Sequence, residues 1–314
     1  MSSYILRRLI NAFPTFLIVG LVAFSLVHLA PGDPASYVLG EDAPEEALNA
    51  MREQMGLTEP LPVQFLTWLA NAVTGDFGKS LITGVPVHQL IFDSLEPTVM
   101  LVTFSMLVAV GIGMPLGVLS AKYRNSPLDK GLLVFSLLGV SMPNFWLGLN
   151  LILLLAVYLE LLPVAGYAEL SNGLDVTLTY LLMPAITLGL SQSAIILRIT
   201  RTSMLEVLGE DYIRTSRAKG LAERVVLLKH ALFNAMIPVL TITGTIFAVL
   251  LGGAIVVEVV FNIPGLGRLT ISAVQNRDYP MIQGVLVFIT LMNIVVHLGI
   301  DVLYSIIDPR IHFR

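Results

Sequence analysis

Residues that could do chemistry are few in this chain, and their spacing matches none of the common catalytic motifs. The 314-residue sequence contains no Cys, which excludes disulfides and thiolate metal sites. It has no Gly-x-x-x-x-Gly-Lys-Ser/Thr loop to hold a nucleotide phosphate, no His-Glu-x-x-His zinc pair and no Gly-x-Ser-x-Gly nucleophile turn. We therefore expect no catalytic residue and no metal site. If energy drives this protein, another chain must supply it.

The most distinctive polar stretch is the basic run at residues 209–230, which lies between two long hydrophobic segments. Asp211 or Thr215 could begin a short helix in this run, and Gly220 could end it. A basic loop of this kind can be attracted to anionic lipid. Here the charges alternate in sign and are interleaved with Ala, Ser and Gly, which favours packing into a protein groove.

The composition indicates an integral membrane protein. The chain is 55% hydrophobic and 13% charged, with a mean hydropathy of +0.83, whereas about a quarter of the residues in a soluble domain are charged. Apolar windows long enough to cross a bilayer occur six times. They span residues 9–30, 98–120, 132–158, 178–200, 237–257 and 281–307. We expect an all-α membrane protein with six transmembrane helices, the first an uncleaved anchor rather than a signal peptide.

The cationic residues predict the orientation. With the N-terminus in the cytoplasm, 14 of the 18 Lys and Arg residues fall on the inner side, as the positive-inside rule requires. Both termini are then cytoplasmic. The outer cations are Arg52, Lys79, Arg268 and Arg277.

We divide the chain into residues 1–30, with the N-terminal tail and first span; residues 31–97, an outer segment; and residues 98–314, a transmembrane core that includes the inner loop 203–236. In the outer segment, we expect amphipathic helices at 44–56 and 62–73 and a turn at 75–78. Its excess of acidic residues fits a solvated cap over the membrane helices. It also fits a docking surface for an extracytoplasmic partner, and both interpretations stay open.

Few features within the spans favour a site. His297 and Asp301 form the only ionisable pair well inside a span, but a hydrogen bond to a neighbouring helix explains Asp301 more simply than transport does. We place Glu258 at an outer helix end, where interfacial exposure would explain it. Pro143 lies in mid-span and predicts a kink. Gly113 and Gly117 form a Gly-x-x-x-Gly pair that predicts close helix packing.

The inner loop resembles the coupling motif of bacterial ATP-driven importer permeases. That motif places Glu-Ala-Ala six residues before an invariant Gly, which Gly220 matches. Arg214-Thr-Ser216 replaces Glu-Ala-Ala, and Phe233 replaces a later Pro. These departures are typical of the dipeptide, oligopeptide, glutathione and nickel branch of the family. Further matches to this branch are Leu29-Ala-Pro-Gly-Asp-Pro34, Gly75-Asp-Phe-Gly-Lys-Ser80, Ser141-Met-Pro-Asn-Phe-Trp146, Val260-Phe-Asn-Ile-Pro-Gly-Leu-Gly-Arg268, Arg277-Asp-Tyr-Pro280 and Asp308-Pro-Arg310.

The resemblance implies a type I ABC importer permease fold of the B-type subunit, in the bacterial cytoplasmic (inner) membrane. The implied partners are a second homologous permease, two ATPase subunits that bind ATP and Mg, an extracytoplasmic substrate-binding protein and the lipid bilayer, without nucleic acid. It also implies an ATPase-coupling surface. Its residues are Glu210, Asp211, Tyr212, Arg214, Thr215, Arg217, Ala218, Lys219 and Gly220. An outer loop that includes Pro264, Gly265 and Gly267 could serve as a gate or as a plain tight connection.

The predicted function is therefore transport and not enzymatic catalysis: a permease subunit for short peptides, glutathione included. The spans contain no His/Met or carboxylate cluster, which argues against nickel, the alternative substrate within the family. An ion-coupled secondary carrier is the rival class. It would need charged residues at mid-bilayer and commonly an internal repeat, and the sequence offers only His297 and Asp301.

Overall fold

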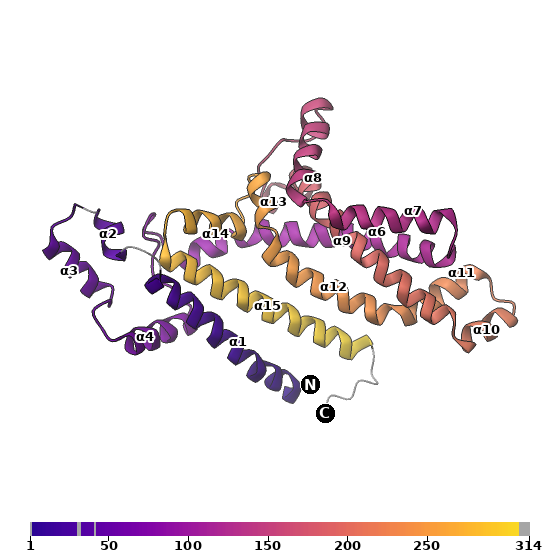
Figure 1. Cartoon of the computed structure of the whole chain (residues 1–314), viewed down its shortest axis with the longest axis horizontal. Helices are drawn as coiled ribbons and strands as arrows, with labels where there is room; N and C mark the ends of the chain where they lie inside the picture. The colour runs from indigo at the N-terminus through magenta and orange to yellow at the C-terminus, as the bar shows by residue number, and fades with distance from the viewer. Residues whose placement is uncertain (1, 30–32, 41, 308–314) are drawn as a thin grey trace. The chain divides into compact units, whose positions relative to one another are not determined.

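The computed structural model describes residues 2–29, 33–40 and 42–307, and these residues are organised almost entirely as helices (Figure 1). The only β-type pairing among them is an isolated bridge between Lys79 and Pro86. The all-helical fold expected from the sequence is therefore confirmed. In chain order the helices are α1 (Ser2–Leu29), α2 (Pro34–Leu39), α3 (Glu45–Gln54), α4 (Leu61–Val73), α5 (Val87–Asp93), α6 (Leu95–Lys122), α7 (Pro127–Ser141), α8 (Asn144–Leu151), η1 (Ile152–Tyr158), η2 (Leu170–Asn172), α9 (Leu174–Leu208), α10 (Asp211–Ala218), α11 (Glu223–Val225), η3 (Val226–Leu232), α12 (Phe233–Gly253), α13 (Ile255–Val260), α14 (Leu266–Gln275) and α15 (Tyr279–Ile307).

Four helical stretches among the described residues are long and apolar enough to cross a membrane. They are Val87–Lys122, Leu174–Leu208, Glu223–Gly253 and Tyr279–Ile300. A fifth candidate is the bent pair Pro127–Ser141 and Asn144–Tyr158, while Phe13–Leu29 forms a shorter apolar helix. The chain therefore has four or five candidate spans by length and composition among these residues.

The predicted single span at 132–158 is wrong in shape, because the chain bends by 100° between α7 and α8. The bend lies at Met142-Pro143. Proline has no backbone N–H and disfavours helical geometry in the residue before it, and Met142 is extended, with ψ 127°. We predicted a kink at Pro143, but the helix ends there and a new one begins.

The chain divides into two compact units, Met1–Glu96 with Arg268–Val295, and Pro97–Gly267 with Val296–Arg314. In the first unit, the amphipathic helices predicted at 44–56 and 62–73 are present as α3 and α4. Helix α3 ends as expected at Gly56, which has a positive φ of 68° that glycine adopts readily. Asp33 caps α2 through the Ala35 N–H and accepts from the Arg52 guanidinium at 2.9 and 2.7 Å, which joins α2 to α3.

Two sequence motifs 198 residues apart also meet in the first unit. The Ser80 hydroxyl donates a 2.5 Å hydrogen bond to the buried carboxylate of Asp278, which also accepts from the Leu81 N–H at 3.2 Å. Ser80 ends the Gly75–Ser80 motif, and Asp278 belongs to Arg277–Pro280. Their contact gives a physical reason for both motifs.

In the second unit, α6 and α9 pack with their backbones close together. A Cβ at Gly113 would lie 2.5 Å from the Ser193 carbonyl oxygen, and one at Gly117 would lie 2.8 Å from the Leu197 oxygen. The close packing predicted from Gly113 and Gly117 is confirmed. Gly189 of α9 contacts α6 in the same way, because a Cβ at Gly189 would lie 2.6 Å from the Ser105 carbonyl oxygen. Residue numbers rise together along both helices, so α6 and α9 run parallel.

Candidate coupling surface

The inner loop forms a short helix, α10, directly after the long helix α9. Only Gly209 and Glu210 separate Leu208 of α9 from Asp211 of α10. Asp211 lies in the first turn of α10 and Arg217 in its last, and both charges complement the helix dipole. The predicted short helix is confirmed, and of its two possible starts, Asp211 and Thr215, it begins at Asp211.

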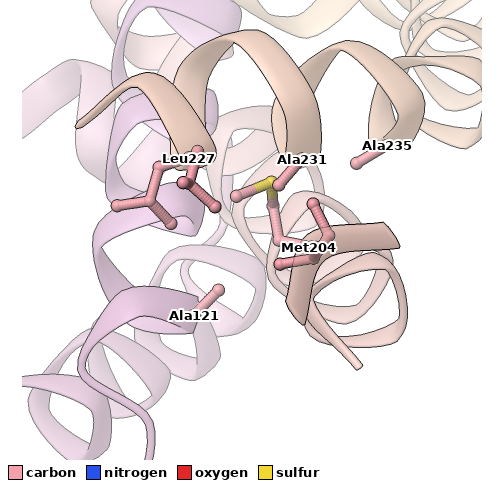
Figure 2. Packing of buried hydrophobic residues seen from close by; sticks show 7 residues of the cluster. Ala121, Met204, Leu227, Ala231 and Ala235 are labelled. Atoms are coloured by element: carbon pink, nitrogen blue, oxygen red, sulfur yellow. The ribbon is translucent and has the colours of Figure 1, made fainter. Parts of the chain in front are cut away.

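One side chain anchors α10 to the rest of the unit. Ile213 is completely buried and belongs to a hydrophobic cluster drawn from α6, α9, α10, η3 and α12. Its members are Ala121, Met204, Ile213, Val226, Leu227, Ala231 and Ala235. Figure 2 shows Met204 of α9 directed toward Ala231 of η3, with Leu227 and Ala121 nearby. Burying a side chain of this size contributes about 1.5–3 kcal/mol, so the cluster holds α10 against α6, α9, η3 and α12.

Gly220 ends α10 through a pair of backbone hydrogen bonds. The Gly220 N–H donates to the Arg217 carbonyl at 2.9 Å, and the Leu221 N–H donates to the Ser216 carbonyl at 3.4 Å. This is the Schellman arrangement, which requires a left-handed residue, and Gly220 has φ 77°. The end of the short helix expected at Gly220 is confirmed. A Cβ there would meet no other described atom of the chain within 4 Å.

An ion pair fixes the chain that leaves α10. The Arg217 guanidinium donates to both carboxylate oxygens of Glu223, at 3.2 and 2.8 Å. These hydrogen bonds raise the pKa of Arg217 above its ordinary value. Tyr212 donates to the His230 carbonyl at 3.5 Å. Partial burial raises the pKa of Tyr212, so the phenol remains a donor at neutral pH.

The predicted coupling residues share one property, which is exposure to solvent. All nine are exposed: Glu210, Asp211, Tyr212, Arg214, Thr215, Arg217, Ala218, Lys219 and Gly220. The geometry suits a protruding, mixed-charge docking element. Sequence reasoning missed Ile213. The signal for it was available, because Ile213 is the only aliphatic residue larger than Ala between Leu208 and Leu221.

In chain order, the predicted outer loop follows α10 after the 21-residue helix α12. At 1.5 Å per residue, α12 is about 30 Å long. Pro264 is exposed, whereas Gly265 and Gly267 are buried. The expectation that Glu258 is exposed at an interface is wrong. Its side chain is completely buried, and it accepts a hydrogen bond from Thr98. The partner, Thr98, lies 160 residues away in the sequence, and the apolar residues next to Glu258 in α13 do not indicate it.

The remaining candidates do not form a second site. His297 is exposed on α15, and the side chain of Asp301 lies outside the described residues, as do Ala30-Pro-Gly32 and Asp308-Pro-Arg310. Across the described part of the chain, no group of three or more His, Asp or Glu side chains could hold a metal ion.

Comparisons with known proteins identify the family to which this chain belongs. Residues 113–313 match the family described as "Binding-protein-dependent transport system inner membrane component", and residues 1–102 match the N-terminal family of the same membrane components. The chain belongs to this family of ABC importer permeases. The permease is thus a transport subunit of the inner membrane, as the coupling motif implied.

Relatives cover the permease from end to end. It is 45% identical to the Probable peptide ABC transporter permease protein y4tP of Sinorhizobium fredii and 43% identical to the glutathione transport system permease protein GsiC of Escherichia coli, each over 100% of both chains. The fold also resembles an inward-facing structure of the MetNI methionine ABC transporter. That match has a TM-score of 0.59 at 19% identity and covers 70% of the permease and 97% of the other chain.

Proposed function

We propose that this permease imports short peptides, glutathione included, and that α10 is the contact through which ATP binding on partner subunits drives it. A second, related permease completes the path, two ATPases bind on the cytoplasmic side, and a substrate-binding protein delivers the peptide from outside. The observation that carries the proposal is the construction of α10, whose nine predicted coupling residues are exposed while Ile213 is completely buried. A helix built this way can receive a force at its surface and pass it inward.

The proposed topology has six transmembrane helices with both termini in the cytoplasm. The parallel directions of α6 and α9 support the number of crossings between these two helices. Gly113 and Gly117 of α6 meet Ser193 and Leu197 of α9 in the same order. Two parallel spans require an odd number of crossings between them. The bent pair α7 and α8, extended by η1, is long enough to supply one crossing, and α1 would supply the first span.

The proposed cycle follows from this connection. Closure of the ATP-bound ATPase dimer would displace α10, and the cluster around Ile213 would transmit the displacement to α9, η3 and α12. The helices would swing so that the path opens outward to receive the peptide, and ATP hydrolysis would reset them. Seven consecutive residues of η3 are π-helical, a rare geometry that is frequent at functional sites.

A peptide substrate is proposed because the relatives that span the whole chain are named as peptide and glutathione permeases. The test is uptake by the complete transporter in proteoliposomes, with labelled dipeptide, tripeptide, glutathione and Ni²⁺ offered through the partner binding protein. We expect ATP-dependent accumulation of a peptide. Uptake of Ni²⁺ alone would replace the substrate assignment. Uptake driven by a proton gradient without ATP would contradict the importer assignment.

The orientation has a direct test because the native chain has no Cys. A single Asp42→Cys variant carries its thiol in the outer segment, and a Thr215→Cys variant carries it on α10; both positions are exposed. A membrane-impermeant maleimide added to intact cells should label the first variant only. Labelling of Thr215→Cys alone would invert the topology.

A further inference from the structure

A buried carboxylate links two helices and a turn at one end of the second unit. The side chain of Glu258, in α13, is completely buried. Its Oε1 atom accepts a 2.7 Å hydrogen bond from the Thr98 hydroxyl in the first turn of α6. The same hydroxyl accepts a 2.8 Å hydrogen bond from the backbone N–H of Leu266. One polar chain therefore joins α6, α13 and the start of α14.

Two glycines allow the backbone to close over this carboxylate. A Cβ at Gly265 would overlap the carboxylate carbon and both carboxylate oxygens of Glu258. A Cβ at Gly267 would lie 2.9 Å from Glu258 Oε2 and 2.6 Å from the Cα of Ile255. Neither glycine has a positive φ among the described residues. Glycine is required at both positions because a side chain would collide with its neighbours, and the Glu258 carboxylate is among those neighbours at each position.

The turn at residues 262–267, which we call the outer turn, is also held through its backbone. Asn262 has φ 54°, and the Ile263 N–H donates to the Glu258 carbonyl at 2.8 Å, so Asn262 ends α13 as glycine ends other helices. The neighbouring Phe261 is buried against Gly148 of α8, and its carbonyl accepts from the Gly166 N–H at 2.8 Å. The residue that directly precedes the outer turn thus contacts α8, while Leu266 within the turn is hydrogen-bonded to α6.

We propose that Glu258 is a positioning residue that fixes the outer turn to the first turn of α6, so that the two move as one body during transport. The inference rests on the proposed importer function. A turn that swung away from α6 would break the hydrogen bond from the Leu266 N–H to the Thr98 hydroxyl. It would also remove the Gly265 backbone from the carboxylate of Glu258 and open a buried charge that is stable only while its surroundings hold it. The outer turn is therefore a fixed rim of the path and not a hinged lid.

The first test compares two replacements in the reconstituted transporter. Glu258→Gln keeps the shape and an acceptor oxygen, so ATP-driven uptake should stay within about threefold of the native rate. Glu258→Ala removes the acceptor, and uptake should fall at least tenfold at equal membrane levels. Glu169→Ala, at an exposed carboxylate of the same unit, is the control and should leave uptake unchanged. Equal loss in Glu258→Gln and Glu258→Ala would show that the charge itself is needed, and would overturn the positioning role.

The second test uses the steric link between Gly265 and Glu258. Gly265→Ala should reduce uptake strongly in the native background, because its Cβ meets the carboxylate. In the Glu258→Ala background, the same change should cost much less, since the obstructing atoms are gone. If Gly265→Ala reduced uptake by the same factor in the native and the Glu258→Ala backgrounds, the two changes would be independent, and this result would contradict the proposed contact.

The closing experiment measures the motion directly. Spin labels at Thr103→Cys, on the exposed side of α6, and Pro264→Cys, in the outer turn, report one distance within the unit; both native residues are exposed. The distance should be the same without nucleotide and with trapped ATP, and should broaden in Glu258→Ala. A nucleotide-dependent change of several ångströms in the native background would identify a hinged lid. Uptake by unlabelled native transporter is measured separately, so its failure would count against the importer function and not against the distance result.

Discussion

The Arg201 guanidinium of α9 donates two hydrogen bonds, both 2.8 Å long, to the carboxylate of Asp129 at the start of α7. The Asp129 side chain is 2% exposed and also accepts from the Ser120 hydroxyl and the Asn125 N–H. Arg201 lies two helical turns before Leu208, the last residue of α9. A displacement that α10 passes to α9 would therefore carry the start of α7 with it.

The first prediction concerns this ion pair. Arg201→Met leaves the Asp129 carboxylate buried without its charged partner, and loss of one partner of a buried pair costs about 3–5 kcal/mol. Thermal unfolding of the purified permease should shift to lower temperature. Arg201→Met with Asp129→Asn should recover part of the loss. Arg198→Met, at an exposed position one turn earlier, is the control, and an equal shift in that variant would show that the pair is not responsible.

The second prediction concerns the anchor of α10. Ile213→Ala leaves a cavity in the cluster around Met204, and a change of this kind in a core costs about 2–5 kcal/mol. The helix should loosen, so trypsin should cut faster after Arg214, Arg217 and Lys219. Leu221→Ala, at an exposed site, should leave the cleavage rate unchanged. Slow, native-like cleavage in Ile213→Ala would mean that the cluster does not hold α10.

Gly220 carries the third prediction. At the φ of 77° that Gly220 adopts, the conformational free energy of a β-branched residue is higher than that of Asn, which tolerates the left-handed region. Gly220→Val should leave the permease inserted but separate ATP hydrolysis from uptake, while Gly220→Asn should keep most of the coupling. The readout is the ratio of peptide imported to ATP hydrolysed. Normal uptake by Gly220→Val at normal membrane levels would count against α10 as the coupling element.

The fourth prediction is a pH dependence in the outer segment. Burial alone would raise the pKa of Asp33, but hydrogen bonds from Arg52 and the Ala35 N–H outweigh it, and the net pKa lies below the ordinary value of 3.8. A lowered pKa stabilises the fold above pH 3.8, and that stabilisation is lost as the pH falls through the lower folded value.

Asp33→Asn should therefore destabilise the outer segment near pH 7, by about 1 kcal/mol or less for a partly exposed pair, and the difference from native should vanish in acid. Unfolding can be followed through Trp68 fluorescence after Trp146→Phe removes the second tryptophan of the chain. A difference that stays the same throughout the acid titration, with no decline as the Asp33 carboxylate becomes protonated, would rule out the ion pair as its cause.

The local elements of this fold were predictable from the sequence, and its long-range polar contacts were not. Helices α3 and α10 end where glycine supplies a left-handed residue, at Gly56 and Gly220, and such signals lie within one helix. The 100° break at Met142-Pro143 was underestimated, because proline in a membrane helix produces anything from a slight kink to a full break. Thr98 lies 160 residues from Glu258, and Arg201 lies 72 residues from Asp129, separations that the residue pattern does not reveal.

If ATP-driven motion enters the permease at α10, this helix must touch an ATPase subunit, and cross-linking can detect that contact. Because the native chain lacks Cys, Thr215→Cys places a single thiol on the exposed surface of α10. It can carry a short photo-cross-linker in the assembled transporter, with Asp42→Cys in the outer segment as the matched control. We predict a cross-link from Thr215→Cys to an ATPase subunit, with a yield that changes when ATP is trapped, and none from Asp42→Cys. Cross-links from Thr215→Cys only to lipid or to the permease itself, in a transporter that still imports peptide, would contradict the claim.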